Sequence, residues 1–297
     1  MFECELPFDH KTLHLELEDK NFAGVMEGHQ NEFKTTKSQE ELVEESLANP
    51  YGSPSLEELC AGKKDIVIIS SDHTRPVPSR VTMPILLHHI HSAAPEARVR
   101  ILVATGMHRP STHEELVNKY GEEIVANEEI VMHVATDDSM MKKIGTLPSG
   151  GECIINKIAA DCDLLLAEGF IEPHFFAGFS GSRKSVLPGI ASYKTIMYNH
   201  NGQFVNDSRA GNLCHNHVSE DMFAAAEMAH LAFVLNVVLN GKHEVIGSFA
   251  GDIHKAHEAG CEFVKSLAGV EPVECEIAIT TNGGYPLDQN IYQAVKG

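Results

Sequence analysis

Short apolar runs alternate with helical patterns through the first half of the chain. Residues 65–70 (Asp-Ile-Val-Ile-Ile-Ser), 98–104 (Arg-Val-Arg-Ile-Leu-Val-Ala) and 163–167 (Asp-Leu-Leu-Leu-Ala) have the length and composition of buried strands. A helix is expected near 81–90, and a capping box at 112–115 begins another. Strands that alternate with helices predict a parallel sheet with right-handed crossovers. We therefore expect an α/β fold, with a Rossmann-like parallel sheet and flanking helices.

Other segments carry simpler patterns. They are a partly alternating stretch expected to form edge strands (2–17), a capping box that opens a short helix (38–47), two strands around the two-residue hairpin signal Asn240-Gly241 (231–239 and 244–249), and an amphipathic helix (252–267).

The last residues predict the start of a second domain. Residues 276–280 (Glu-Ile-Ala-Ile-Thr) are expected to form a fourth short strand, and the chain ends at Gly297, shortly into another helical pattern. One strand and one helix cannot form a core alone. We expect a cofactor-binding α/β domain over 1–270 and the beginning of a truncated second α/β domain over 271–297.

Composition narrows the class of protein. A net charge of −19 on 297 residues argues against nucleic-acid or anionic-membrane partners, because phosphate contact needs clustered Lys and Arg. We expect no signal peptide, because the start lacks a basic and an apolar segment, and no apolar run has membrane-spanning length. Seven dispersed cysteines without a C-x-x-C pair fit reduced thiols and a cytoplasmic location.

The functional signal is the convergence of polar loops. Asp72 and Arg75 follow the first strand, His108 follows the second, and His174 with Lys184 follows the third, while residues after Thr280 follow the fourth. The carboxyl ends of parallel strands share one edge, so these residues can meet there. Two histidines can act as acid and base near neutral pH, and an arginine fork suits a carboxylate or phosphate.

The glycine-rich segment 178–185 resembles a Walker A loop, but imperfectly. Every fixed position matches except the second glycine, where Arg183 stands, and Pro188 would interrupt the helix that should cap a phosphate. The segment therefore suits an anion or cofactor but disfavours an NTPase.

Each candidate also has a structural interpretation. Asp72 can be an Asx-turn residue, Arg75 can pair with a surface carboxylate, and His200 alone is not a metal site. We expect His254 and His257, which are spaced to share a helix face, to lie on a solvated one.

Six motifs together resemble the nickel-dependent lactate racemase family in order and spacing. They are Ser71-Asp-His-Thr-Arg-Pro76, Thr105-Gly-Met-His-Arg-Pro110, Glu172-Pro-His174, the segment from Gly178 to Gly189, Asn199-His-Asn201 and Tyr292-Gln-Ala-Val-Lys296. The resemblance covers the first domain and the beginning of the second.

The resemblance implies a nickel-pincer nucleotide, which is a nicotinate-derived mononucleotide tethered to a lysine, here Lys184. Two sulfurs and a ring carbon of the cofactor bind nickel, with His200 as the protein ligand. The cofactor-contacting residues that match are Asp72, His73, Thr74, Arg75, Ser180 and Ser182. It further implies that cofactor-biosynthesis enzymes act on the chain.

The resemblance also implies a mechanism. His108 and His174 match acid/base residues, one for each enantiomer of a 2-hydroxy acid. One takes the hydroxyl proton while hydride leaves carbon for the cofactor, and hydride returned to the other face of the keto acid inverts it. Arg75, Gln293 and Lys296 match substrate contacts, and Tyr292 lines the same pocket. Lactate, a bulkier 2-hydroxy acid and a sugar acid all fit these residues.

Two alternatives remain from sequence. One is a nucleotide-dependent oxidoreductase, although no G-x-G-x-x-G follows the first clear strand. The other is a non-catalytic protein that binds acidic metabolites. With most of the second domain missing, we expect the 297-residue chain to bind cofactor poorly or to turn over slowly.

Overall fold

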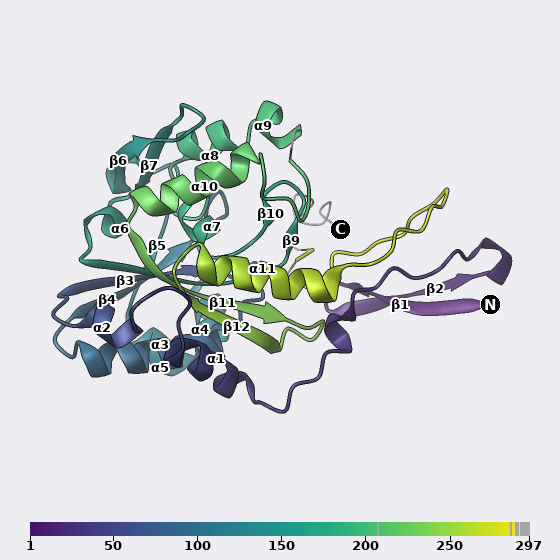
Figure 1. The fold of residues 1–297 in the computed structure, drawn as a ribbon, viewed down its shortest axis with the longest axis horizontal. Helices are drawn as coiled ribbons and strands as arrows, with labels where there is room; N and C mark the ends of the chain where they lie inside the picture. Colours follow the sequence, from purple (N-terminus) through teal and green to yellow (C-terminus); the bar gives the residue numbers. More distant parts are fainter. Residues whose placement is uncertain (207, 286, 289–290, 292–297) are drawn as a thin grey trace.

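A six-stranded sheet forms the centre of the computed structural model, which describes residues 1–206, 208–285, 287–288 and 291 (Figure 1). The strand order is β12-β11-β8-β3-β4-β5, and every neighbouring pair is parallel except β11 and β12. The strands are β3 (Asp65–Ser71), β4 (Arg98–Ala104), β5 (Glu129–Met132), β8 (Leu164–Phe170), β11 (Leu231–Leu239) and β12 (Val245–Gly251). This architecture confirms the predicted α/β fold.

Strand β3 shows why the sheet has two hydrophobic faces. Ile66 and Ile68 belong to one core cluster, while Val67 and Ile69 belong to another, and none of the four is exposed. Successive side chains of a strand point to opposite faces, so a continuous apolar run needs cover on both sides.

Helices provide that cover. The cluster that contains Ile66 and Ile68 packs beneath five helices, namely α1 (Gln39–Ala48), α2 (Leu56–Cys60), α3 (Ser79–Ala93), α4 (His113–Tyr120) and α5 (Glu122–Asn127). The second packs beneath α6 (Lys157–Asp161), α7 (Arg183–Val186), α8 (Tyr193–Asn199), α9 (Gly202–Asn206) and α10 (His217–Met228), and helix α11 (Lys255–Ala268) covers β11 and β12. Figure 1 shows the two groups on opposite sides of the sheet. The predicted capping boxes at Ser38 and Thr112 both form.

Short elements complete the chain. They are the hairpin strands β1 (Phe2–Phe8) and β2 (Lys11–Leu17), β6 (Met141–Thr146) and β7 (Glu152–Asn156), β9 (Pro173–His174) and β10 (Gly178–Phe179), and the 3-10 turns η1 (Asp19–Asn21), η2 (His29–Asn31) and η3 (Asp138–Met140). No helix in the described part of the chain is long and apolar enough to cross a membrane.

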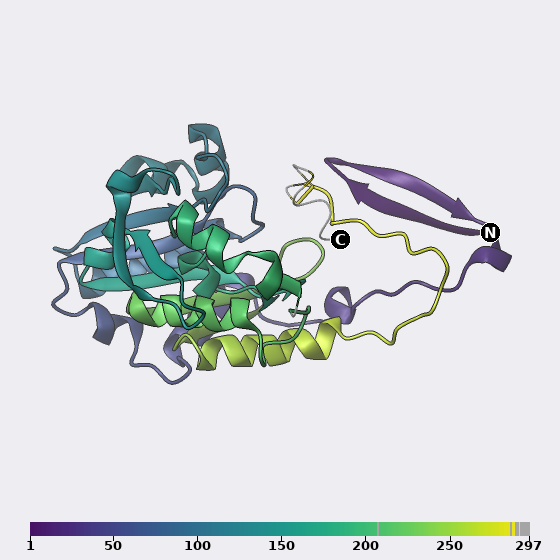
Figure 2. The same ribbon diagram turned by 90° about the horizontal axis from the view of Figure 1, so that it is seen from above.

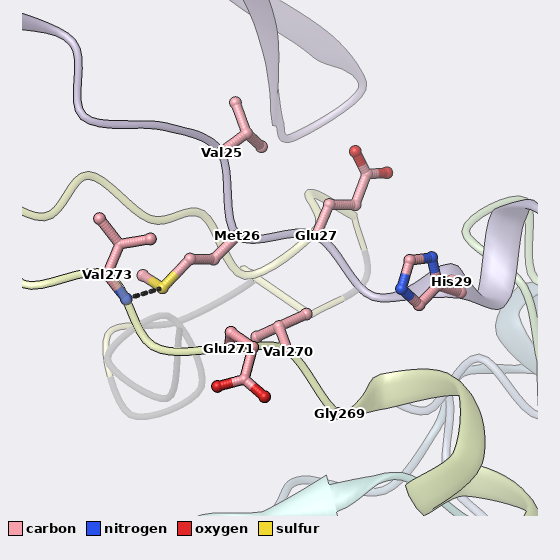
Figure 3. A pocket seen from close by; sticks show the side chains of 8 residues that line it. All are labelled: Val25, Met26, Glu27, His29, Gly269, Val270, Glu271 and Val273. Atoms are coloured by element: carbon pink, nitrogen blue, oxygen red, sulfur yellow. Dashed lines mark hydrogen bonds between the residues drawn. The ribbon is translucent and has the colours of Figure 1, made fainter.

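The N-terminal strands do not join the edge of the central sheet, contrary to expectation. They pair only with each other and lie away from the body of the molecule (Figure 2). Their turn contacts the last described residues instead: Asp9 accepts a backbone hydrogen bond from Tyr285 and donates one to Asp288. Residues 25–29 and 269–273 lie side by side around a cavity of about 430 Å³ between the hairpin and the body (Figure 3).

The predicted strand over 276–280 is wrong. The segment is irregular, and Ile277 and Ile279 are 79% and 52% exposed. A strand needs a neighbour to satisfy its backbone groups, and this segment pairs with no strand of the described chain.

The predicted hairpin between β11 and β12 forms, but its turn is longer than two residues. Asn240 donates its backbone N–H to the carbonyl of Glu244, and His243 has a φ of 62°. The Asn240 side-chain oxygen accepts from the backbone N–H groups of Lys242 and Glu244. This side-chain bonding stabilises a three-residue loop that ends in the left-handed region.

The buried central strands should carry most of the stability. Ile68→Ala in β3 is expected to lower the free energy of unfolding by about 2–5 kcal/mol, because it leaves a cavity in a closed core. Ile277→Ala, at an exposed position, is the control and should change it by less than about 0.5 kcal/mol. Urea unfolding measures both, and equal losses would contradict the placement of the core.

Candidate active site

The loops that follow β3, β4 and β8 line one cavity of about 840 Å³. Its walls include nine of the predicted site residues, namely Asp72, His73, Thr74, Arg75, His108, His174, Ser180, Lys184 and His200. The predicted convergence of three loops is therefore confirmed. The loop after Thr280 does not take part, because that segment is not in the sheet.

Asp72 and His108 form a pair at the end of β3. The His108 Nδ1 atom lies 2.7 Å from Asp72 Oδ2, and the other carboxylate oxygen accepts hydrogen bonds from the backbone and hydroxyl of Thr74. Burial raises the pKa of Asp72, but the hydrogen bond and charge of His108, together with Thr74, outweigh it and lower the pKa. A carboxylate only accepts, so Nδ1 of His108 carries the hydrogen of this pair, and in the neutral ring Nε2 is then the acceptor.

His174 differs from His108 in that its Nδ1 atom accepts hydrogen bonds. It ends the two-residue strand β9, and its Nδ1 accepts hydrogen bonds from the backbone N–H groups of Phe176 and Ala177, at 3.4 and 3.2 Å. A neutral ring bonded in this way carries its hydrogen on Nε2. The two histidines thus differ in tautomer, one with an acceptor and one with a donor at Nε2.

Phe176 connects three of the predicted site residues. Its ring is buried and makes edge-on contacts with His174 and His200, whose ring centroids lie 4.6 and 5.0 Å away. The Lys184 Nζ atom lies 5.6 Å from the centroid of the same ring. Phe176 was not among the predicted site residues, although an aromatic residue inside a glycine-rich functional loop can indicate a ligand contact.

Arg183 explains the departure from the Walker pattern. Its guanidinium is buried and donates to the carbonyls of Ala177, Phe179 and Ser180 and to the hydroxyl of Ser219. Burial lowers its pKa to about 10. Helix α7 has four residues and ends before Pro188, so no long phosphate-capping helix follows. The arginine holds the glycine-rich loop from within.

His257 contradicts the expectation of a solvated face. It is 2% exposed, and its Nε2 atom lies 2.7 Å from a guanidinium nitrogen of Arg183 and 2.8 Å from the carbonyl oxygen of Ser180, while His254 is half exposed as expected. Burial and the charge of Arg183 hold the pKa of His257 well below its usual value. The buried side of α11 packs beneath the site loop, which the residue spacing alone could not show.

The two predicted serines differ in position. Ser180 lines the cavity, and its hydroxyl donates to the carbonyl of Phe170 and accepts from the backbone of Glu172. Ser182 is fully buried, and its hydroxyl donates to Asn236 of β11 rather than reaching the cavity. Asn236 could not be singled out from sequence, because it occupies an ordinary position in a strand.

The remaining predicted residues are placed as follows. His200 follows α8, and its backbone N–H caps the helix at Ile196. His73 bonds Ser111 through Nδ1, and burial lowers its pKa. Tyr292, Gln293 and Lys296 lie outside the described residues. Within the described ranges no three His, Cys, Asp or Glu side chains gather as a metal site.

Comparison with known proteins gives consistent matches. The family model for the lactate racemase N-terminal domain matches residues 8–212, and that for the lactate racemase C-terminal domain matches residues 270–297. A lactate racemase of Lactiplantibacillus plantarum is 64% identical over the whole chain, which covers 70% of that protein. One of Thermoanaerobacterium thermosaccharolyticum is 50% identical with the same coverage.

A solved structure agrees with these sequences. The lactate racemase apoprotein from Thermoanaerobacterium thermosaccharolyticum superposes with a TM-score of 0.92 at 49% identity, over 99% of this chain and 70% of that one. The agreement in fold extends over nearly the whole of the present chain.

The buried Arg183 should contribute far more to the free energy of unfolding than an exposed arginine does. Arg183→Met leaves three carbonyls without their donor and is expected to lower the free energy of unfolding by about 3–5 kcal/mol. Arg98→Met removes a surface pair with Glu129 and should cost less than about 1 kcal/mol. Thermal and urea unfolding compare them, and a small loss at Arg183 would show that the loop is held by other contacts.

Proposed function

The chain belongs to the lactate racemase family, and we propose that it racemises a small 2-hydroxy acid, with lactate as the first candidate. Two of its relatives are lactate racemases at 64% and 50% identity. The observation that carries the proposal in this chain is the pair of histidines His108 and His174, hydrogen-bonded in opposite senses at Nδ1, on one cavity with Arg75.

The cavity fits a nucleotide cofactor together with a small acid. Its volume of about 840 Å³ lies in the range of ligand sites. It offers a primary amine at Lys184 and an imidazole at His200, beside the glycine-rich loop. An amine can form a covalent link, imidazole suits nickel, and the backbone amides of a glycine-rich loop suit a phosphate.

We propose that Lys184 holds a nickel-pincer nucleotide covalently and that His200 is the protein ligand of its nickel. When bound, this group would supply the hydride chemistry that no side chain can perform. The ring of Phe176 contacts His200 and lies near the amine of Lys184, so both residues rest against one aromatic side chain. Asp72, His73, Thr74 and Arg75 line the same cavity.

The histidines would move the proton of the substrate hydroxyl. His108 can take that proton at Nε2, because Asp72 fixes the tautomer and stabilises the charge that forms on the ring. His174 would act on the other enantiomer, so one residue serves each face of the planar keto acid. Arg75 lines the same cavity and would hold the substrate carboxylate through its planar fork.

We also propose substrate contacts beyond the described residues and a division of the chain into two domains. A bulkier 2-hydroxy acid or a sugar acid has the same reacting group, and Tyr292, Gln293 and Lys296 are proposed as further substrate contacts. We propose that residues 1–270 form the cofactor-binding domain and that 271–297 begin the second domain.

Both histidines should be required for racemisation in each direction. With the protein loaded by the cofactor-making enzymes, His108→Gln and His174→Gln are each expected to lower the rate by about 100-fold or more, since general acid–base steps contribute that much. Chiral chromatography of D- and L-lactate measures the rates.

His91→Gln is the matched control. His91 lies on α3, is 43% exposed in its side chain and pairs with Glu128 away from the cavity. Its variant should keep the parent rate. If either His108→Gln or His174→Gln also kept it, the proposed acid–base roles would be wrong.

A further inference from the structure

Glu168 is a buried carboxylate on the wall of the cavity with no role in the mechanism above. It lies near the end of β8, has no exposed surface and lines the cavity. Its Oε1 atom accepts hydrogen bonds from Ser70 at 2.5 Å and Ser79 at 2.6 Å, and its Oε2 atom accepts one from Thr82.

All of these partners act as donors. Tyr120 donates to the Ser70 hydroxyl at 2.8 Å, which directs the hydrogen of Ser70 toward Glu168. Carboxylate oxygens accept hydrogen bonds, and these hydroxyls supply donors to both of them. Hydrogen bonds to a charged acceptor are about twice as strong as those between neutral groups.

The three hydroxyls come from both sides of one turn. Ser70 stands at the end of β3, while Ser79 and Thr82 stand in the first turn of α3. Residues 71–78 between them carry Asp72, Thr74 and Arg75. Glu168 therefore links the start and the end of the segment 71–78, which lines the cavity.

The beginning of α3 lacks an ordinary cap. Its N-cap residue is Pro78, which makes no side-chain hydrogen bond to the helix. The carboxylate of Glu168 lies beside this helix end, where a negative charge is favoured by the helix dipole. Lys119 of α4 adds a further contact to the 71–78 segment: its Nζ atom donates a hydrogen bond to the hydroxyl of Ser71, 3.2 Å away.

We infer that Glu168 is a positioning residue of the active site, which fixes the segment 71–78 and through it the Asp72–His108 pair and Arg75. The inference about catalysis rests on the proposed racemase function. The inference about the segment itself does not, because Glu168 holds it in the protein without substrate.

The variant Glu168→Gln tests the role of the charge. The amide keeps the shape and can still accept from Ser70 and Ser79, while its NH₂ would face Thr82, whose hydroxyl can turn to the carbonyl of Pro78, 3.4 Å away. The fold should be retained, but the first turn of α3 is held less tightly. Ser79→Ala combined with Thr82→Val removes the donors instead and should act in the same direction.

Asp163→Asn is the matched control. Asp163 directly precedes the same strand, and its carboxylate holds the opposite end of β3 by accepting from the backbone of Lys64 and Asp65. It does not line the cavity. The three variants and the parent are first compared by hydrogen exchange without cofactor. After loading with cofactor, kcat and KM for lactate, the urea midpoint and the mass of the Lys184 peptide are measured for each.

We expect faster exchange in residues 71–78 for Glu168→Gln and for the double variant, but not for Asp163→Asn. We also expect a roughly 10–100-fold loss of kcat/KM under conditions where the urea curves show each variant fully folded, with the Lys184 mass close to that of the parent. Unchanged exchange in 71–78, or a loss of kcat/KM no larger than that of Asp163→Asn, would overturn the inference. An inactive parent with faster exchange in the variants would instead count against the proposed function alone.

Discussion

The parallel pairing of β3 with β4 and β8 is the constraint on which the site depends. Ile69 pairs with Leu102 on one side and with Ala167 on the other, so the three strands reach the same edge of the sheet. Residues that are far apart in sequence, such as Asp72, His108 and Lys184, therefore line one cavity. A shift of register would move whole loops and separate the histidine from its carboxylate.

Buried charged groups then hold the loops at that edge. Arg183 supplies donors to carbonyls inside the glycine-rich loop, and Glu168 supplies acceptors to hydroxyls at both ends of the 71–78 segment. Each group is costly to bury, so its partners must be complete. The result is a cavity whose reactive side chains are held by groups that do not themselves react.

The sequence predicted the sheet and the convergence of loops because both depend on local patterns. Apolar runs such as 65–70 can be stable only when covered on both faces, and that requires the βαβ arrangement. The prediction failed where the outcome depended on distant partners. Residues 276–280 have an apolar centre but lack a neighbouring strand among the described residues, and His257 is polar but packs against Arg183 in the fold.

The family resemblance named more of the candidate site than the residues alone did. The residues suggested an acid, a base and an anion site, but the roles of Lys184 and His200 came from the resemblance. Ser182 illustrates the limit of both, because its hydroxyl bonds Asn236 inside the protein. Phe176 was missed because its importance lies in its three neighbours and not in its own chemistry.

The proposed chemistry depends on a nickel cofactor that is covalently tethered to the loop after β8. Mass spectrometry of the Lys184 peptide, together with the nickel content of the intact protein, tests this most directly after expression with the cofactor-making enzymes. We expect an added nucleotide mass on Lys184, accompanied by nickel, with both absent in Lys184→Ala. An unmodified Lys184 peptide in protein that racemises lactate would contradict it.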